Sequence, residues 1–461
     1  MGTRQEKDTM GLMEVPDDAY YGAQTQRAVQ NFSISELRFP RSFIRSVGLI
    51  KKHAAIVNRE LGLLDWGIAD AIAQAAQEVV DGKLDDQFVV DVFQTGSGTS
   101  TNMNTNEIVA GRANEILGGP RGGRSPVHPN DHVNKGQSSN DVIPTTIHVA
   151  CLTEIRGALL PAMETLHAAL ETKAAQFAKV RKIGRTHLQD AVPMTLGQEF
   201  SAYARQVALG IERVRGAEQH LAELALGGTA VGSGLNAHPQ FAPGVIRRLA
   251  EETGCPFREA ENHFEAQAAQ DSAVETSGAL KTYAVSLIKI ANDIRWLSSG
   301  PRCGLGEVMI PSLQPGSSIM PGKVNPVIPE VVMQVAAQVI GNDATITYAG
   351  QGGYFELNVM LPVIAYNLLQ SVSLLANASQ RLAEKCVQGI EADADRCAAF
   401  IEQSLAMSTP LVPVIGYDES AALSKEAYAT GKTVREVALQ KQVLPEAELN
   451  RILDQVVQDD S

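Results

Sequence analysis

The stretch AVETSGALKTYAVSLIKIANDIRWL, residues 273–297, decides the fold. Its apolar residues recur three and four positions apart, at Ala273, Leu280, Ala284, Leu287, Ile288, Ala291 and Ile294. This spacing places them on one face of a long α-helix. Apolar residues also occur off that face, at Val274, Val285, Ile290 and Trp296. We therefore expect a helix in a bundle, with a second apolar face that packs against other subunits.

The same helical period recurs along most of the chain. It appears in residues 42–62, 66–80, 152–170, 195–224, 330–348 and 361–383, and in the shorter tail segments 395–406, 419–429, 433–441 and 445–457. We predict a mainly α protein with a mixed, mainly helical N-terminal domain (1–135), a central long-helix bundle (136–392) and a small helical C-terminal domain (393–461). Three segments rich in Gly, Pro, Ser and Asn, 94–106, 120–145 and 300–329, are predicted loops that carry the chemistry.

Composition excludes several classes of protein. The chain has 461 residues, 44% of them hydrophobic and 20% charged, which is typical of a globular protein. Its formal net charge of −13 would repel nucleic acids, although a local pocket can still bind a small anion. Five cysteines without a Cys-x-x-Cys pair suggest neither a disulfide framework nor a zinc ribbon. Without a signal-like start or a run of 18 apolar residues, we expect a cytoplasmic protein with no membrane partner.

Familiar cofactor motifs are missing. The glycines of LGGTAVGSGLN (226–236) are not followed by Gly-Lys-Ser/Thr, so a close turn between helices is favoured over a nucleotide loop. The nine histidines show no metal-binding spacing, and no Gly-x-Ser-x-Gly follows a predicted strand. We therefore expect no metal and no cofactor.

The segment GSSIMPGKVNP, residues 316–326, combines hydroxyls, a flexible backbone, one cation and one amide. Lys323, Asn325 and loop N–H groups could hold a carboxylate whose charge grows as a neighbouring C–H proton leaves, and a serine could accept that proton. By itself, the segment fits a solvated surface turn equally well.

Five further blocks accompany this loop in order. They are QTGSGTSTNMNTNE (94–107), HPNDHVNKGQSSNDVIPT (128–145), KIGRTHLQDAVPMTLGQE (182–199), ELALGGTAVGSGLN (223–236) and KIANDIRWLSSGPRCGLGE (289–307). With the loop, they resemble the fumarase/aspartase superfamily over essentially the whole chain. Thr186-His187, Ser138-Ser139-Asn140 and Pro321-Gly322-Lys323 resemble class II fumarases, which hydrate fumarate to L-malate in the tricarboxylic acid cycle. Residues 327–330 and 357–362 look partly aspartase-like, so aspartate ammonia-lyase is the alternative, and a non-catalytic protein like the lens crystallins is a second rival.

The resemblance implies a role for each site residue. Ser317 would remove the C3 proton of malate, while Lys323 and Asn325 would stabilise the resulting aci-carboxylate. His187 would act through a water on the departing C2 hydroxyl, oriented and kept charged by Glu330. The residues implied to bind the dicarboxylate are Ser97, Thr99, Ser138, Ser139, Asn140, Thr186, Ser318, Lys323 and Asn325.

Two further features are implied by the same resemblance. His128, Asn130 and Asp131 resemble a second dicarboxylate site outside the catalytic pocket, although Asn and Asp after Pro are equally typical of an ordinary turn. The family fold is a homotetramer with a twenty-helix core, and residues from three subunits would meet in each active site. The implied partners are fumarate, L-malate and three further copies of the chain.

Overall fold

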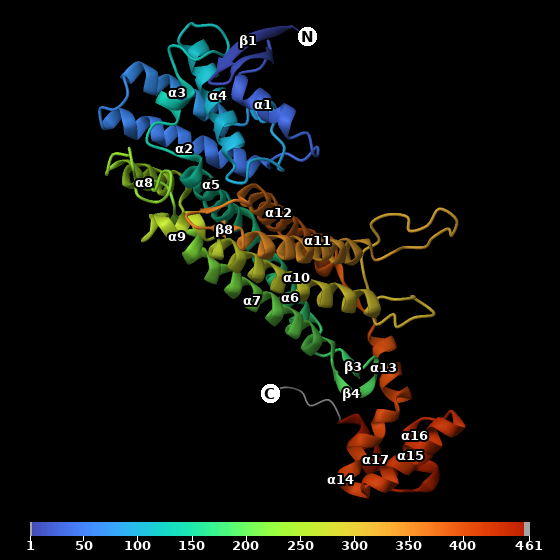
Figure 1. The fold of residues 1–461 in the computed structure, drawn as a ribbon. Coiled ribbons are helices and arrows are strands. Elements are labelled where there is room, and N and C mark those ends of the chain that lie inside the picture. The colour runs from blue at the N-terminus through green and yellow to red at the C-terminus, as the bar shows by residue number, and fades with distance from the viewer. Residues whose placement is uncertain (1, 456–461) are drawn as a thin grey trace. The chain divides into compact units, whose positions relative to one another are not determined.

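The structure, a computed structural model, describes residues 2–455 (Figure 1). Its contacts divide the chain into two units that we describe separately. The first unit contains Met1–Pro161, Gly210–Ala284 and Ala336–Ala376, and the second contains Ala162–Leu209, Val285–Val335 and Asn377–Ser461. The end of the segment 445–457, predicted to be helical, lies outside the described residues.

The N-terminal part pairs a β-hairpin with helices. Its elements are β1 (Thr3–Asp8), β2 (Gly11–Pro16), α1 (Ala23–Asn31), α2 (Arg41–Glu60), α3 (Trp66–Val80), a 3₁₀ turn (Asp85–Gln87), α4 (Thr99–Ile116) and a π-helical turn (Pro129–Val133). Helix α2 packs against α3, α5 (Ser139–Glu154) and α8 (Phe241–Thr253), and its inward face is apolar, including Phe43, Val47 and Ile50. Helix α1 has no side-chain cap of its own, and the Glu107 carboxylate accepts the N–H groups of Gly22, Gln24 and Thr25 instead.

Long helices dominate the middle of the chain, as the 3.6-residue period predicts. They are α5 (Ser139–Glu154), which runs through a π-helical turn (Ile155–Leu159) into α6 (Leu160–Gln176), α7 (Leu196–Leu221), α8 (Phe241–Thr253), α9 (His263–Ala268), α10 (Asp271–Leu297), α11 (Val327–Gly350) and α12 (Leu361–Lys385). The tail contains α13 (Ala394–Gln403), a 3₁₀ segment (Leu405–Leu411), α14 (Val412–Ile415), α15 (Tyr417–Thr430), α16 (Val434–Lys441) and α17 (Glu446–Asp454).

The remaining strands are short. They are β3 (Arg181–Thr186), β4 (Gln189–Thr195), β5 (Glu223–Leu224), β6 (Arg258–Glu259), β7 (Val308–Met309), β8 (Gly353–Tyr354), β9 (Leu357–Asn358) and β10 (Glu391–Ala392). Within residues 2–455 the strands pair only in twos: β1–β2, β3–β4, β8–β9 and β7–β10 are antiparallel, and β5–β6 is parallel. The fold is therefore mainly helical, as predicted.

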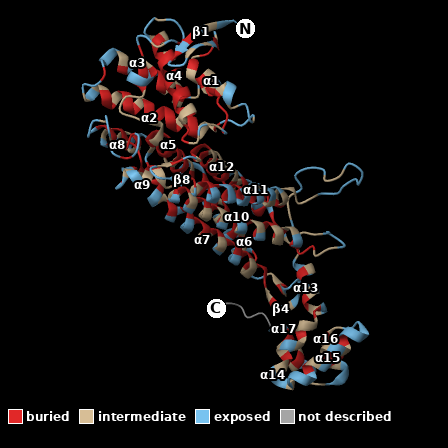
Figure 2. Ribbon diagram, in the orientation of Figure 1, coloured by how far each residue is buried: buried red, intermediate tan, exposed pale blue. Residues whose placement is uncertain are grey.

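Most of the stripe predicted on 273–297 is buried in α10, where Leu280, Ala284 and Leu287 have no exposed surface. Ile288 on the stripe is only half-buried, and Ile290, predicted off the stripe, is fully buried. Off that stripe, Val285 is 53% exposed and Trp296 is 47% exposed. Figure 2 shows the same alternation of buried and exposed residues along the long helices. Helix α11 likewise leaves Tyr348 exposed, so α10 and α11 both carry apolar surface that this single chain does not cover.

The loop boundaries were predicted wrongly in all three segments. Helix α4 begins at Thr99 inside the predicted loop 94–106, and α5 begins at Ser139 inside 120–145. Helix α11 begins at Val327 inside 300–329. Thr, Ser and Asn usually favour turns because their side chains compete for backbone groups. In α4 polar side chains are buried and hydrogen bonded instead, as the Asn102 and Asn106 amides both donate to the side-chain oxygen Oδ1 of Asn134.

Candidate active site

Three of the predicted substrate-binding hydroxyls lie together in the first unit. The Thr99 hydroxyl is 2.8 Å from that of Ser97 and 2.7 Å from that of Ser139. Ser97 is 7% exposed, and Thr99 and Ser139 are half-buried. We call Ser97, Thr99 and Ser139 the hydroxyl cluster. It joins two segments 40 positions apart in the sequence.

Two helix N-termini meet at the hydroxyl cluster. Thr99 is the first residue of α4 and Ser139 is the first residue of α5, so the N–H groups at both helix starts face the same place. Helix N-termini attract anions through these N–H groups and the helix dipole. Gly98 enters α4 with a positive φ of 72°, and a Cβ there would lie 2.9 Å from Ile143, which explains the glycine.

Ser138 and Asn140 complete this group. The Ser138 hydroxyl caps α5 by accepting the N–H of Asn140 at 3.2 Å, and the Asn140 amide donates to the carbonyl of Ala230 at 2.8 Å. The predicted set 97, 99, 138, 139 and 140 is thus brought together in the first unit. The glycine-containing turn around Ala230 supports its edge, in agreement with the close-turn interpretation.

Asp141 supports this group from within the fold and was not predicted. Its fully buried carboxylate accepts the N–H groups of Ser138 at 2.9 Å, Gly227 at 3.0 Å and Thr229 at 2.9 Å. Burial raises the pKa of Asp141 to about 6. Burial also lowers the pKa of Lys51 to about 7, and its ammonium donates to Asn134 and Gln137. The Ser-x-x-Asp capping box at 138–141 is the sequence signal that could have found Asp141.

Thr186 and His187 form the tip of a β-hairpin in the second unit. Thr186 ends β3, and His187 and Leu188 make the two-residue turn before β4. Both turn residues have positive φ, 56° and 59°, as a type I′ hairpin turn requires. Thr186 and His187 are exposed, and no hydrogen bond to the His187 ring is found within residues 2–455. The turn therefore presents the imidazole to the surroundings.

A buried ion network anchors this hairpin. Arg185 donates to both oxygens of Glu307, at 2.9 and 3.0 Å, and Lys182 lies 3.4 Å from Glu307 and 2.9 Å from Glu199. Glu307 is fully buried and Lys182 is 1% exposed. These charged residues were not predicted from the sequence. They lie inside two of the quoted blocks, but the spacing within each block does not show that 182–185 and 307 pair.

The 316–326 loop folds around Ser317. The Ser317 hydroxyl accepts the N–H groups of Ile319 at 3.2 Å and Met320 at 3.0 Å. The loop closes where the N–H of Gly316 donates to the Lys323 carbonyl at 2.7 Å, and the Asn325 amide donates to the Gly316 carbonyl at 2.7 Å. The loop thus aims two N–H groups at one serine oxygen.

The charged groups of the second unit are not assembled around His187. Lys323 is exposed and Glu330 is half-buried in the first turn of α11. In the part of the chain that the structure describes, no hydrogen bond or ion pair joins His187 to Ser317, Ser318, Lys323 or Glu330. The predicted orientation of His187 by Glu330 is therefore not made within one chain.

His128, Asn130 and Asp131 lie together at the start of the π-helical turn. The Nδ1 atom of His128 accepts the N–H groups of Asn130 at 3.2 Å and Asp131 at 3.1 Å. Burial lowers the pKa of His128, so we assign the neutral ring with Nδ1 as an acceptor, and not the ion pair that its 3.3 Å distance to Asp131 would allow. His128 therefore has a capping role here, and its second-site role stays a prediction.

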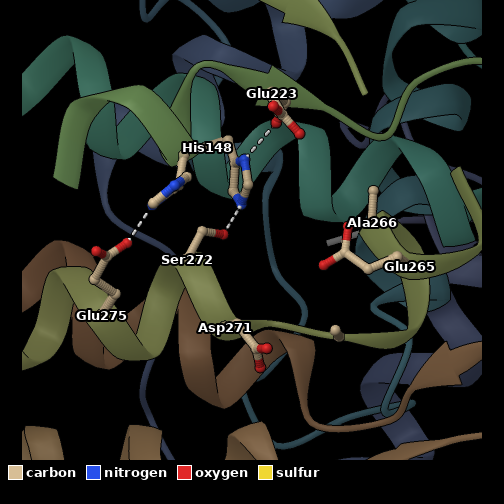
Figure 3. Close-up of a pocket in the computed structure, with 9 residues that line it drawn as sticks. His148, Glu223, Glu265, Ala266, Asp271, Ser272 and Glu275 are labelled. Carbon is tan, nitrogen blue, oxygen red and sulfur yellow. Dashed lines mark hydrogen bonds and ion pairs between the residues drawn. The ribbon is translucent and has the colours of Figure 1, made fainter. Parts of the chain in front are cut away.

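A distinct acidic pocket lies elsewhere in the first unit (Figure 3). His148 lines this pocket. Its Nδ1 atom lies 2.6 Å from the Glu223 carbonyl oxygen, and its Nε2 atom lies 2.9 Å from the Ser272 hydroxyl. Glu265 and Asp271 also line it, and burial together with neighbouring carboxylates raises the pKa of Glu265. Its negative charge would repel a dicarboxylate, so we do not place the substrate there.

No group of three or more His, Cys, Asp or Glu side chains in residues 2–455 is arranged to hold a metal ion.

The helical stretch Leu361–Gly389 is long and apolar enough to span a membrane, which the absence of a run of 18 apolar residues did not predict. However, 61% of its most apolar window is buried inside the fold. This burial is typical of a core helix.

Comparison with known proteins agrees with the resemblance in the sequence. The family models described as "Lyase" and "Fumarase C C-terminus" match residues 11–341 and 407–456. The chain is 54% identical over 451 residues to "Fumarate hydratase class II" of Methylorubrum extorquens, covering 98% of this chain and 96% of the relative. It is 56% identical over 451 residues to the protein of the same name from Halobacterium salinarum, covering 98% and 96%.

Solved structures show the same fold. The class II fumarase of Schistosoma mansoni superposes with a TM-score of 0.95 at 39% identity, covering 98% of both chains. A fumarate lyase:delta crystallin from Brucella melitensis, whose structure is described as bound to cobalt, gives a TM-score of 0.93 at 48% identity, covering 98% of this chain and 99% of the other.

Proposed function

Because this chain belongs to the class II fumarate hydratases, a family of lyases, we propose that the hydroxyl cluster, the hairpin turn and the 316–326 loop together form its active site. Its reaction is the reversible hydration of fumarate to L-malate. Two helix N-termini and several hydroxyls suit the binding of a dicarboxylate, because they supply donors to negative charge without a buried counter-ion.

Ser317 is the base that removes the C3 proton of malate. Two N–H groups, of Ile319 and Met320, donate to its hydroxyl oxygen, and this observation carries the assignment. Hydrogen bonds donated to an oxygen stabilise its charged form, so they make the serine easier to deprotonate. The Ser317 hydroxyl first gives its own proton to solvent water, and its alkoxide then takes the C3 proton. The C–H bonding pair forms a double bond from C3 to the neighbouring carboxylate carbon, and a carboxylate C=O pair moves onto oxygen to give the aci-carboxylate.

The charge that grows on this carboxylate is stabilised by Lys323 and Asn325. The Lys323 ammonium has no protein partner within residues 2–455, and one Asn325 amide hydrogen is used inside the loop, so the other is free to donate. Ser318 is exposed beside Ser317 and is placed to bind the same carboxylate. Such preorganised donors lower the barrier because they match charge that develops during the reaction.

His187 supplies the proton that the leaving C2 hydroxyl needs, through a water, with Thr186 beside it. An imidazole is a common general acid and base, and one ring nitrogen can donate a proton in one direction of the reaction and accept it in the other. Glu330 would orient the ring from another subunit. In the aspartase-like segment 357–362, Asn358 is buried and its amide donates to the Ala349 carbonyl at 3.0 Å, so this residue has a structural role and does not support ammonia loss.

The active site is shared by subunits of a homotetramer. Two observations support this proposal: His187 lacks its predicted partners within one chain, and α10 and α11 expose apolar side chains such as Val285 and Tyr348. The five free cysteines agree with a reducing, cytoplasmic compartment, in which the tricarboxylic acid cycle would use this activity. The three-domain division at 135 and 392 stays a prediction.

Hydrogen exchange at C3 of malate tests the two catalytic roles separately. In D₂O, a His187→Asn variant should still exchange the C3 proton of L-malate, seen by proton NMR, while it loses most fumarate formation. A Ser317→Ala variant should lose both reactions. C3 exchange that persists in Ser317→Ala would contradict the assignment of the base.

A further inference from the structure

An arginine-lined cavity of about 500 Å³ lies in the first unit, where the start of α2 meets the middle of α12 and the end of α5. Arg38, Arg41 and Arg45 line it, with Glu154 as the only carboxylate among its lining residues. We call it the arginine pocket. None of its lining residues belongs to the hydroxyl cluster or to the group at 128–131. Three guanidiniums in one cavity are notable in a chain of net charge −13.

The donors of this pocket are only partly used by the protein. Arg41 is held by Asp85 at 3.3 Å and by the carbonyls of Val79 and Val80, yet its buried Nη1 atom has no partner. The Arg38 Nη1 atom donates to the carbonyls of Ser35 and Leu37, and its other nitrogens have no acceptor among the described residues. Arg45 makes no hydrogen bond or ion pair within residues 2–455, although Glu154 lines the same cavity.

The backbone adds donors at the same place. Arg41 and Ser42 are the first two residues of the 20-residue helix α2, whose start has no side-chain cap. The described part of the chain provides no acceptor for their N–H groups. A helix start attracts anions, and Arg guanidiniums bind phosphate or carboxylate oxygens in a forked geometry.

The wall of the pocket formed by α12 is partly apolar. Tyr366, Leu369 and Leu374 line it together with the polar side chains of Gln370 and Ser373, and Leu369 is buried and Tyr366 half-buried. A cavity of this size with a partly apolar wall and convergent polar groups is the usual form of a small-molecule site. We propose that the arginine pocket binds a compact organic dianion, a phosphate ester or a dicarboxylate, at a site distinct from the active site.

Two charge-changing variants of the arginine pocket should alter the affinity for a dianion in opposite directions. Binding of inorganic phosphate and of succinate is measured by calorimetry on the purified full-length protein at low salt. Arg45→Gln should weaken the binding of at least one dianion about tenfold or more, the usual worth of a hydrogen bond to a charged group. Glu154→Gln should strengthen the same binding several-fold, because it removes the carboxylate that competes with the ligand.

Controls separate this pocket from general charge effects. Arg247→Gln, at an exposed arginine 3.9 Å from Glu251, changes the net charge equally and should leave binding unchanged. Malate turnover should be unchanged in all three variants. If Arg45→Gln does not fold, Arg38→Gln replaces it. The binding that Arg45→Gln removes is measured for phosphate, for succinate and in competition between the two. The anion that binds more tightly in this comparison decides which of the two sources fills the site.

Three results would overturn the proposal. They are no measurable binding of either dianion, equal losses in Arg45→Gln and Arg247→Gln, or weaker binding in Glu154→Gln.

Discussion

The buried carboxylate of Asp141 accepts the backbone N–H of Thr229 at 2.9 Å, across 88 positions of sequence. The same side chain holds the N–H of Ser138, so one carboxylate joins the glycine-rich turn to the start of α5. This contact fixes the backbone from which the proposed substrate-binding hydroxyls of Ser138 and Ser139 project. We therefore expect Asp141 to act as a positioning residue.

Replacing Asp141 by Asn should loosen this support. The amide keeps one acceptor oxygen but turns an NH₂ group toward a backbone N–H, which should cost about 1–3 kcal/mol of unfolding free energy. We expect a higher KM for malate with a smaller effect on kcat, measured by steady-state kinetics and urea unfolding. In the Lys51→Met/Asp141→Asn double variant, the stability losses should be less than additive. Additive losses together with an unchanged KM would contradict the positioning role.

Lys51 should make stability depend on pH. Its pKa is about 7 in the folded protein and 10.5 in the unfolded chain, so between these values the unfolded chain binds more protons. Unfolding free energy should therefore rise with pH across this window. The difference between wild type and Lys51→Met, measured by urea unfolding at several pH values, isolates this contribution. If the difference in unfolding free energy between wild type and Lys51→Met stays constant or falls from pH 7 to 10, the predicted contribution of Lys51 is wrong.

Removing the Thr99 hydroxyl should weaken substrate binding. Thr99→Val keeps the shape of the side chain but breaks the chain of hydroxyls from Ser97 to Ser139, and KM should rise about tenfold or more. Ser100→Ala is the matched control, because its hydroxyl bonds only to exposed Thr95, and its kinetics should match wild type. Equal changes of KM in both variants would show that Thr99 is not a substrate-binding residue.

Glu307→Gln should damage the hairpin that carries His187. The change leaves Arg185 without a carboxylate partner and Lys182 with Glu199 alone, and breaking such a buried pair typically costs about 3–5 kcal/mol. Urea unfolding measures the loss, and malate turnover should fall with it. Asp190→Asn, at an exposed position of β4 in the same hairpin, should change neither quantity. A Glu307→Gln protein as stable as wild type would show that the network is not needed.

Helix positions were predictable from the sequence because apolar side chains at a 3.6-residue period must share one buried face. The predicted 273–297 helix and the observed α10 at Asp271–Leu297 differ by two residues. The start of α4 was not predictable in this way, because Asn102 and Asn106 bury polar groups whose partner, Asn134, comes from a distant turn. Periodicity contains no information on such a partner.

The candidate site was predictable where residues carry a recognisable pattern, as in 97–99, 138–140 and 316–326. Other residues act through contacts between segments far apart in sequence, so their roles could be recognised only from the folded structure. These residues are Asp141, Lys182, Arg185 and Glu307. The pairing of His187 with Glu330 depends on other subunits in our account, and one chain cannot supply it.

Subunit sharing gives a complementation prediction. His187→Asn and Ser317→Ala tetramers, each nearly inactive, should regain part of the wild-type malate turnover when they are dissociated together and reassembled. The restored activity comes from sites that receive both wild-type residues from different subunits. Mixed tetramers, verified by mass spectrometry, that stay inactive would show that each site is built from one chain.

The most direct measurement follows the absorbance of fumarate with L-malate and, in parallel, with L-aspartate as the only substrate. A leaving hydroxide must be protonated, so the acid His187 is useful for malate, whereas the aspartate ammonium leaves already protonated. We predict fast fumarate formation from malate, little from aspartate, and a loss of about 10²-fold or more with malate in His187→Gln. Faster fumarate formation from aspartate than from malate would contradict the account.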